Sequence, residues 1–243
     1  MGDLEETTAG DSTTNGGSDG TTNPPVVHAG AAEVGTALAR GAVVAVPAVG
    51  GYSLAVQVGT HDAETRLEAL AADPDGPHYA VGHRNDVRAL TSGWSEEVER
   101  LLERCWPGPV DVFLSRAAAA GVAQPAAEGE VQATEPRTGG WAVTVGMPES
   151  RAIRRLCKEH GPWRTIPLTF NEPSEVARAF DVADVALVVD GGRREGEPPT
   201  LIDATVTPVR VLREGALPSQ FIDATMAMGN RKRWFSRSRP KED

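Results

Sequence analysis

The two cysteines come first, because a thiol can act as a nucleophile, bind zinc or form a disulfide. Cys105 and Cys157 are the only cysteines among the 243 residues. Two thiols cannot build a four-thiolate zinc site or a disulfide framework. Neither is paired with a histidine in a recognisable catalytic motif. The sequence therefore assigns no catalytic residue and no metal site to them.

The C-terminal segment is the second candidate for chemistry. Residues 229–243 carry six Lys and Arg against two acids, a net charge of +4, with Trp234 and Phe235 among them. Basic residues interleaved with aromatic ones can contact RNA or an anionic membrane surface. The alternative is a solvated tail, which is the usual state of such a charge run. We expect residues 229–243 to be a disordered basic tail whose contact with RNA needs a test.

The charge elsewhere is acidic. The net charge of the whole chain is −10, and residues 1–25 hold five acids and no Lys or Arg, which leaves −9 for the part between the tails. Such a body is a poor candidate for a bulk nucleic-acid coat, because neutralising phosphates needs surplus cations. Residues 1–25 are rich in Gly, Ser, Thr and Asn, so we expect a disordered acidic tail. No apolar run is long enough to span a bilayer, and no signal peptide is visible, so we expect a soluble, cytoplasmic protein.

The elements between the tails alternate between strands and helices. The sequence patterns predict helices at 31–40, 63–71, Glu96–Cys105, Glu149–His160 and Ser174–Phe180. They predict strands at Ala42–Val46, Tyr52–Val58, Tyr79–Val81, Val110–Leu114, Trp141–Val145, Ile166–Phe170, Val185–Val189, Thr200–Asp203 and Val209–Leu212. Residues 117–139 are rich in Ala, Gly, Pro and Glu and are predicted to form a loop. Interleaved elements of this kind predict one α/β domain over residues 26–228.

Five landmarks in this body occur in an order that resembles the YrdC family, whose members make threonylcarbamoyl-adenylate for tRNA modification. The landmarks are Gly41–Pro47 with Tyr52–Leu54, then Trp106–Val110, Pro167–Asn171, Asp190–Gly192 with Pro199–Asp203, and Val211–Leu217. They extend over about Ala31 to Leu217. The resemblance implies a twisted mixed α/β sheet with flanking helices and a concave cleft.

The same resemblance implies a nucleotidyltransferase. In the family, threonine and bicarbonate give a carbamate, the carbamate attacks the α-phosphorus of ATP, and pyrophosphate leaves. Such a reaction needs cations or amide donors at the phosphates, and Mg²⁺ normally assists it. The substrate- or nucleotide-binding residues carried over to this sequence are Tyr52, Thr169, Asn171, Thr200 and Arg213.

Each of these residues also has a structural interpretation. Asn171 precedes Glu172 and Pro173 and can be a turn residue. Thr169 can simply pack in a strand and Tyr52 in the core, and Arg213 can hydrogen-bond a loop. Arg84 and Arg88 are expected at the surface.

The departures from the family pattern fall on its phosphate site. The loop Pro47–Leu54 lacks the family's two threonines and its carboxylate. The stretch Ala71–Gly76 contains two aspartates where the family has a Lys-x-Arg pair, and no arginine occurs in Thr144–Gly146, near which a family arginine aligns. Pro199 replaces a serine. An acid at triphosphate range repels the nucleotide.

Two functions remain open from the sequence. One is a threonylcarbamoyl-adenylate synthase that uses threonine, bicarbonate and ATP with Mg²⁺. The other is a pseudoenzyme, a catalytically inactive YrdC-like binding module for a small ligand, a partner protein or RNA. Fold alone does not decide between them, and the deciding feature is whether cations from elsewhere in the chain refill the cleft.

Overall fold

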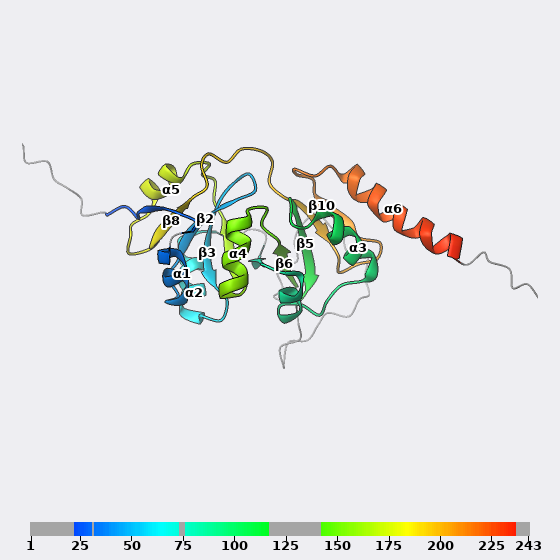
Figure 1. The fold of residues 1–243 in the computed structure, drawn as a ribbon, viewed down its shortest axis with the longest axis horizontal. Helices are drawn as coiled ribbons and strands as arrows, with labels where there is room; N and C mark the ends of the chain where they lie inside the picture. The colour runs from blue at the N-terminus through cyan, green and yellow to red at the C-terminus, as the bar shows by residue number, and fades with distance from the viewer. Residues whose placement is uncertain (1–21, 31, 73–75, 117–141, 237–243) are drawn as a thin grey trace, which may run out of the picture.

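The computed structural model describes residues 22–30, 32–72, 76–116 and 142–236. In these parts of the chain ten strands form one mixed sheet, flanked by helices (Figure 1). The strands are β1 (Val26–His28), β2 (Val44–Ala48), β3 (Gly51–Gln57), β4 (His78–Ala80), β5 (Val110–Ser115), β6 (Ala142–Gly146), β7 (Trp163–Pro167), β8 (Leu187–Asp190), β9 (Thr200–Asp203) and β10 (Arg210–Arg213). The helices are α1 (Ala32–Ala39), α2 (His61–Leu70), the 3₁₀ helix η1 (Arg84–Ala89), α3 (Glu96–Cys105), α4 (Arg151–His160), α5 (Pro173–Ala179) and α6 (Ser219–Ser236).

The order of the strands in the sheet differs from their order in the chain. It is β1-β8-β2-β3-β7-β4-β6-β5-β9-β10. Pairs β1/β8, β2/β8, β4/β6 and β5/β9 are parallel, and the others are antiparallel. The predicted mixed α/β sheet with flanking helices is confirmed. Strands that lie far apart in the sequence therefore become neighbours at the middle of the sheet.

Local sequence explains where the helices begin and which side they bury. In α3, Ser95 caps the first turn by accepting a hydrogen bond from the Val98 amide, and glutamates in that turn favour the positive end of the helix dipole. Val98, Leu101 and Leu102 recur at helical spacing and are buried. The same pattern, with Ser150 as the cap, forms α4.

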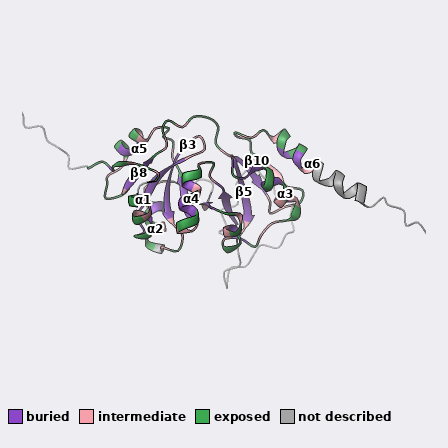
Figure 2. Ribbon diagram, viewed as in Figure 1, coloured by how far each residue is buried: buried purple, intermediate pink, exposed green. Residues whose placement is uncertain are grey.

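The helices divide between the two faces of the sheet. Apolar side chains of α1 and α4 pack on one face, with Leu38 and Trp163 fully buried between them. Helices α2 and α5 cover the other face over β2, β3 and β8, and α3 and α6 cover it over β5 and β6. Figure 2 shows the strands buried and the outward sides of the helices exposed. Among the described residues, the core cluster that contains α1 and α4 includes no side chain of β5 or β6, so these two helices do not cover the first face there.

Several details differ from the sequence predictions. Strand β7 begins at Trp163, three residues before the predicted Ile166, and β1, η1 and α6 were not predicted. The predicted start of the basic tail at residue 229 falls inside α6, which continues to Ser236 and extends away from the sheet (Figure 1). Residues 1–21, the predicted loop 117–139 and residues 237–243 lie outside the described residues. No described helix is long and apolar enough to cross a membrane.

Candidate binding cleft

A cleft occupies the open part of the face that α1 and α4 cover incompletely. Its volume is about 350 Å³, and a narrower recess of about 70 Å³ continues from it. Residues that line both hollows make them continuous: Ala48, Val49, Ser53, His78, Asp111 and Pro199. The loop after β2 and the segment before β9 form the walls, and β3, β4, β5 and β6 supply the floor.

Strand register places four polar side chains in a row across this floor. His78 of β4 is paired with Thr165 of β7 on one side and with Thr144 of β6 on the other. Asp111 of β5 is paired with Gly146, two residues along β6 from Thr144. Directly paired residues, and residues two apart in a strand, point to the same face. Thr165, His78, Thr144 and Asp111 therefore face the cleft together.

His78 and Asp111 form the centre of the row. His78 Nε2 lies 3.1 Å from Asp111 Oδ2, and His78 Nδ1 lies 2.5 Å from the Thr165 hydroxyl. The side chain of Asp111 is 12% exposed and that of His78 is 24% exposed. Both ring nitrogens of His78 are engaged, so the ring holds the carboxylate in one orientation.

Gly146 makes room for the Asp111 carboxylate. A Cβ built on residue 146 would meet Asp111 Oδ1 far inside the 3.0 Å that real Cβ atoms keep, and would lie 3.5 Å from His78 Nε2. Any side chain at residue 146 would therefore displace the carboxylate. The position of the Asp111 carboxylate therefore depends on residue 146 being glycine.

Thr144 is the one member of the row without a polar partner. Its side chain lines the cleft and the residue is 3% exposed, yet its hydroxyl makes no hydrogen bond to any described residue. A buried hydroxyl without a partner costs about 1–3 kcal/mol. The hydroxyl oxygen itself has almost no accessible surface, so it is enclosed within the floor and is not open to a ligand in this conformation.

Positive charge is scarce around the cleft. Among the described residues, Arg213 at the end of β10 is the one Lys or Arg that lines it. Arg164 is buried beneath the sheet, where it donates to the backbone carbonyl of Thr165 (2.7 Å) and lies over the Tyr79 ring. It alternates with Thr165 along β7 and so points to the opposite face. Arg194 donates to the Ala48 carbonyl (3.1 Å) without lining the cleft.

Comparison with known proteins shows the family to which this chain belongs. The family model Sua5_yciO_yrdC, described as telomere recombination, matches residues 36–215. The chain belongs to the Sua5/YciO/YrdC family. No curated protein matches it by sequence.

Solved structures agree with this family in fold. Sua5 of P. abyssi in complex with L-threonine superposes with a TM-score of 0.65 at 22% identity, over 79% of this chain and 56% of that chain. A variant of the same Sua5 gives 0.65 at 24% identity, over 79% and 58%. YciO of E. coli gives 0.65 at 18% identity, over 80% and 96%. This Sua5/YciO/YrdC chain thus spans somewhat more than half of the Sua5 chains and nearly all of YciO.

Of the predicted site residues, Tyr52 and Arg213 line the cleft of this family member. The Tyr52 hydroxyl donates to the Gly192 carbonyl (2.9 Å) and accepts from the Gly191 amide (3.1 Å). Burial, the largest influence, raises the pKa of the Tyr52 phenol. Tyr52 therefore fixes the segment after β8 against β3. Its role in binding a ligand stays a prediction, as does that of Arg213.

Thr200 is fully buried and holds the chain that returns after β10. Its hydroxyl donates to the Leu217 carbonyl (2.5 Å) and accepts from the amides of Gly215 (3.0 Å) and Leu217 (3.1 Å). These bonds use the whole capacity of the hydroxyl. In this conformation Thr200 supports the wall of the cleft and has no bond to spare for a ligand.

Thr169 and Asn171 are exposed and lie outside the cleft lining. Asn171 sits at its rim, because a Cβ built on Gly51 would be 3.6 Å from Asn171 Oδ1. The Asn171 amide donates to Glu175 and its carbonyl accepts from the Arg194 amide, bonds expected of a turn residue. Contact of Thr169 or Asn171 with a ligand stays a prediction.

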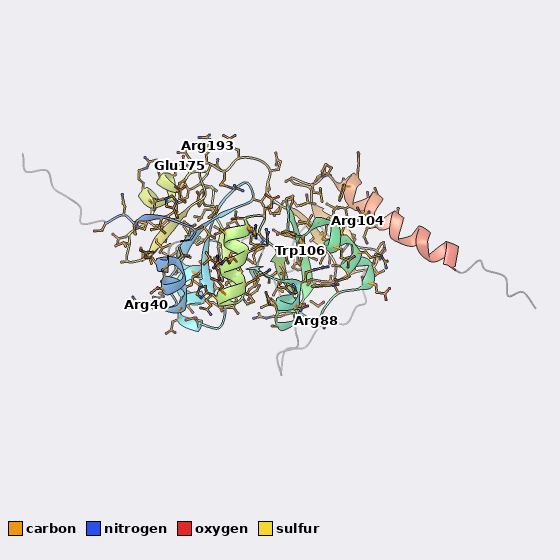
Figure 3. The ribbon with its side chains drawn as sticks, in the orientation of Figure 1. Arg40, Arg88, Arg104, Trp106, Glu175 and Arg193 are labelled. Carbon is orange, nitrogen blue, oxygen red and sulfur yellow. The ribbon has the colours of Figure 1, made fainter. Side chains whose placement is uncertain are left out.

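Other residues from the sequence analysis have structural roles. Trp106, labelled in Figure 3, is buried. Its indole donates to the Val110 carbonyl at 2.7 Å. Arg88 is exposed, and Arg84 pairs with Glu99 at 2.9 Å. Among the described residues, no group of three His, Cys, Asp or Glu side chains is placed to hold a metal.

Sequence reasoning missed the floor of the cleft: His78, Thr165, Thr144 and Asp111. One signal was available, because Asp111 is a charged residue inside the apolar strand Val110–Leu114. A charge in a buried strand is rare unless it is paired or functional.

Proposed function

We propose that this chain is a YrdC-like binding module whose cleft takes a small polar ligand, and that it does not make threonylcarbamoyl-adenylate. The observation that carries the proposal is the Asp111 carboxylate, which His78 holds at the floor of the cleft beside Gly146. A volume of about 350 Å³ and a largely apolar lining suit a small molecule.

Electrostatics argue against a triphosphate in this cleft. Two like charges about 4 Å apart repel by roughly 4 kcal/mol at the effective dielectric constant of a protein surface. Asp111 would impose this on any phosphate placed near the floor, and Arg213 is the single described Lys or Arg in the lining that could offset it. In the stretch 71–76, which the resemblance aligns with the family's Lys-x-Arg pair, the sequence has two aspartates and no cation. The lining residues therefore do not fit ATP, and they support no catalytic step through ATP or Mg²⁺.

A second candidate is the synthase itself, acting on threonine, bicarbonate and ATP in tRNA modification. The family match over residues 36–215 favours it, and so does the similarity in fold to a Sua5 that binds L-threonine. Arg213 would then contact the nucleotide, and other cations would have to come from outside the described residues.

Pyrophosphate release separates the two candidates. The full chain is incubated with ATP, L-threonine, bicarbonate and Mg²⁺, and a family member of proven activity is measured in parallel. We expect no release above a reaction without protein, while circular dichroism shows folded protein. Release that depends on L-threonine would establish the synthase and overturn the binding module.

Contact with RNA is a separate proposal for the basic segment. Residues 231–233 carry three cations and lie within the helical range of α6, and three more follow beyond the described residues. Removing residues 229–243 should abolish salt-sensitive binding to RNA in a filter or mobility-shift assay. Removing residues 237–243 alone keeps α6 whole and should weaken binding in part. Unchanged binding after the longer deletion would exclude the segment as the contact.

A further inference from the structure

We infer that the acidic residues 3–6 of this chain dock in a groove between α1 and α4. The groove shares no lining residue with the cleft. The inference therefore goes beyond the proposed function and holds whatever the cleft binds. It names both an interaction surface and the segment that occupies it.

The groove is a hollow of about 850 Å³ between two helices that pack side by side on the first face of the sheet (Figure 1). Its α1 wall consists of small residues, among them Ala32 and Gly35. Its α4 wall carries Arg151, Arg155 and the apolar Leu156. Small residues on one wall let a peptide backbone approach closely, and the arginines on the other wall can bind carboxylates.

Helix α4 is positive in an otherwise acidic molecule. It contains four Lys and Arg against one acid, Glu159, a net charge of +3, while the part of the chain between the tails carries −9. Arg151 is exposed and has no acidic partner among the described residues. Arg155 pairs with Glu159 at 2.7 Å, yet its side chain stays 78% exposed. Both arginines can therefore accept a further carboxylate.

The first turn of α4 lacks the acid that a helix start favours. The positive end of the helix dipole stabilises acids and disfavours cations. Helices α1, α2, α3 and α5 each have at least one acid in the first turn, whereas α4 has none and begins with Arg151. A carboxylate supplied from another segment would compensate both the dipole and Arg151.

Residues 3–6 supply matching chemistry. Their sequence is Asp-Leu-Glu-Glu, three carboxylates around one leucine, and residues 1–21 as a whole hold five acids and no Lys or Arg. Leu4 would pack against Leu156 and the small side chains of α1. The neighbouring carboxylates would form charge-assisted hydrogen bonds with Arg151 and Arg155, which are stronger than neutral ones.

The chain is long enough for this contact. Thr22 is held by a hydrogen bond from its amide to Asp181, and it lies seven residues before Ala29, which lines the groove. Seven residues span at most about 25 Å, whereas residues 7–21 can span about 50 Å. Because the segment and the groove belong to one chain, their effective concentration is on the order of millimolar, which suffices for a weak contact.

A spin label tests the contact in the full chain. Gly2→Cys provides a thiol next to residues 3–6, and both native cysteines are buried. We expect the oxidised label to broaden the amide NMR signals of Gly35 and Ala152 and to leave those of α3 unchanged. The broadening should disappear in about 1 M salt, where charges are screened beyond about 3 Å. Groove signals that are unchanged at low salt would overturn the inference.

Two matched pairs of acids show which part of the segment docks. In the labelled chain, Glu5→Gln with Glu6→Gln removes two charges from the inferred contact, and we expect the broadening to be lost. Asp11→Asn with Asp19→Asn removes two charges outside the contact and should leave the broadening in place. Equal effects of the two pairs would mean a general attraction between opposite charges, and would contradict docking by residues 3–6.

A charge reversal tests the groove side. Arg151→Glu should abolish the broadening, and folding should persist because an acid suits the first turn of a helix. Arg88→Glu is the control, since Arg88 is also exposed but does not line the groove. Undiminished broadening in folded Arg151→Glu protein would refute the site. If the label leaves the groove unaffected while an added polyglutamate peptide shifts the groove signals, the groove serves a separate partner and the inference is wrong.

Discussion

Asp111 and Gly146 face each other across β5 and β6, and the carboxylate of the first fills the space that a side chain on the second would need. The sequence interval Thr144–Gly146 is where the resemblance to the YrdC family places an arginine. A negative group thus lies where that resemblance implies a positive one. Under the proposed function, this arrangement lowers the affinity of the cleft for polyanions while the family fold is kept.

Replacing Gly146 should test this fit. Gly146→Ala brings a methyl group against the carboxylate, so we expect a loss of about 2 kcal/mol in the free energy of unfolding, typical of overpacking. Urea denaturation measures it. Gly30→Ala is the control, since a Cβ there meets nothing within 4 Å. In the Gly146→Ala background, Asp111→Ala should recover part of the loss, and strict additivity of the two changes would contradict the contact.

Tyr52 should stabilise the segment after β8 through its hydroxyl. Tyr52→Phe removes the bonds to Gly191 and Gly192, and we expect a loss of about 2 kcal/mol in unfolding free energy. Hydrogen exchange of the Gly191 amide should accelerate. Tyr79→Phe serves as the comparison, because the Tyr79 hydroxyl has no hydrogen bond to a described residue. Equal effects of the two changes would refute the role of the Tyr52 hydroxyl.

The Thr200 hydroxyl should contribute substantially to the stability of the folded protein. Thr200→Val leaves two amides and a carbonyl of the 215–217 segment without their partner, so we expect a loss of about 3 kcal/mol in unfolding free energy. Thr225→Val removes a hydroxyl that has no partner among the described residues and should change stability little. Thermal denaturation of both variants measures the difference, and a small effect at residue 200 would show that the bonds contribute little.

The fold of several elements follows from local sequence alone. The bounds of α3 and β9 match the predicted ranges Glu96–Cys105 and Thr200–Asp203. In α3 the apolar spacing, the Ser95 cap and the acidic first turn all favour the same helix. By contrast, the predicted start of β7 is too late, because the charged residue Arg164 interrupts the apolar pattern of the strand. Arg164 can be buried because carbonyl groups and a tyrosine ring of the folded sheet contact it, and no local sequence pattern shows these contacts.

The floor of the cleft could not be predicted in the same way. Its side chains come from β4, β5, β6 and β7, and their row exists through strand pairings that join residues up to 87 positions apart. Register of this kind is decided by the assembled sheet. The resemblance pointed to Tyr52 and Arg213, which do line the cleft. It could not point to His78 or Asp111, because they are not part of the matched motifs.

The thiols should react slowly in the folded protein. Burial raises the pKa of both Cys105 and Cys157, and Cys157 is fully buried. A raised pKa lowers the fraction of reactive thiolate at a given pH, so modification by a thiol reagent at about pH 8 should be slow, and slowest at Cys157. Mass spectrometry of each site measures the rates. Denaturant should make both fast, and rapid labelling of Cys157 in folded protein would contradict its burial.

Isothermal titration of the full chain with ATP and Mg²⁺, with and without L-threonine, shows whether the cleft accepts a nucleotide. We expect no saturable heat, because the cleft places a carboxylate at its floor and, within the described chain, a single arginine in its lining. Asp111→Asn should allow weak binding at most. Saturable binding of ATP at micromolar concentration to the unmodified chain would refute the exclusion of polyanions and make the synthase the better description.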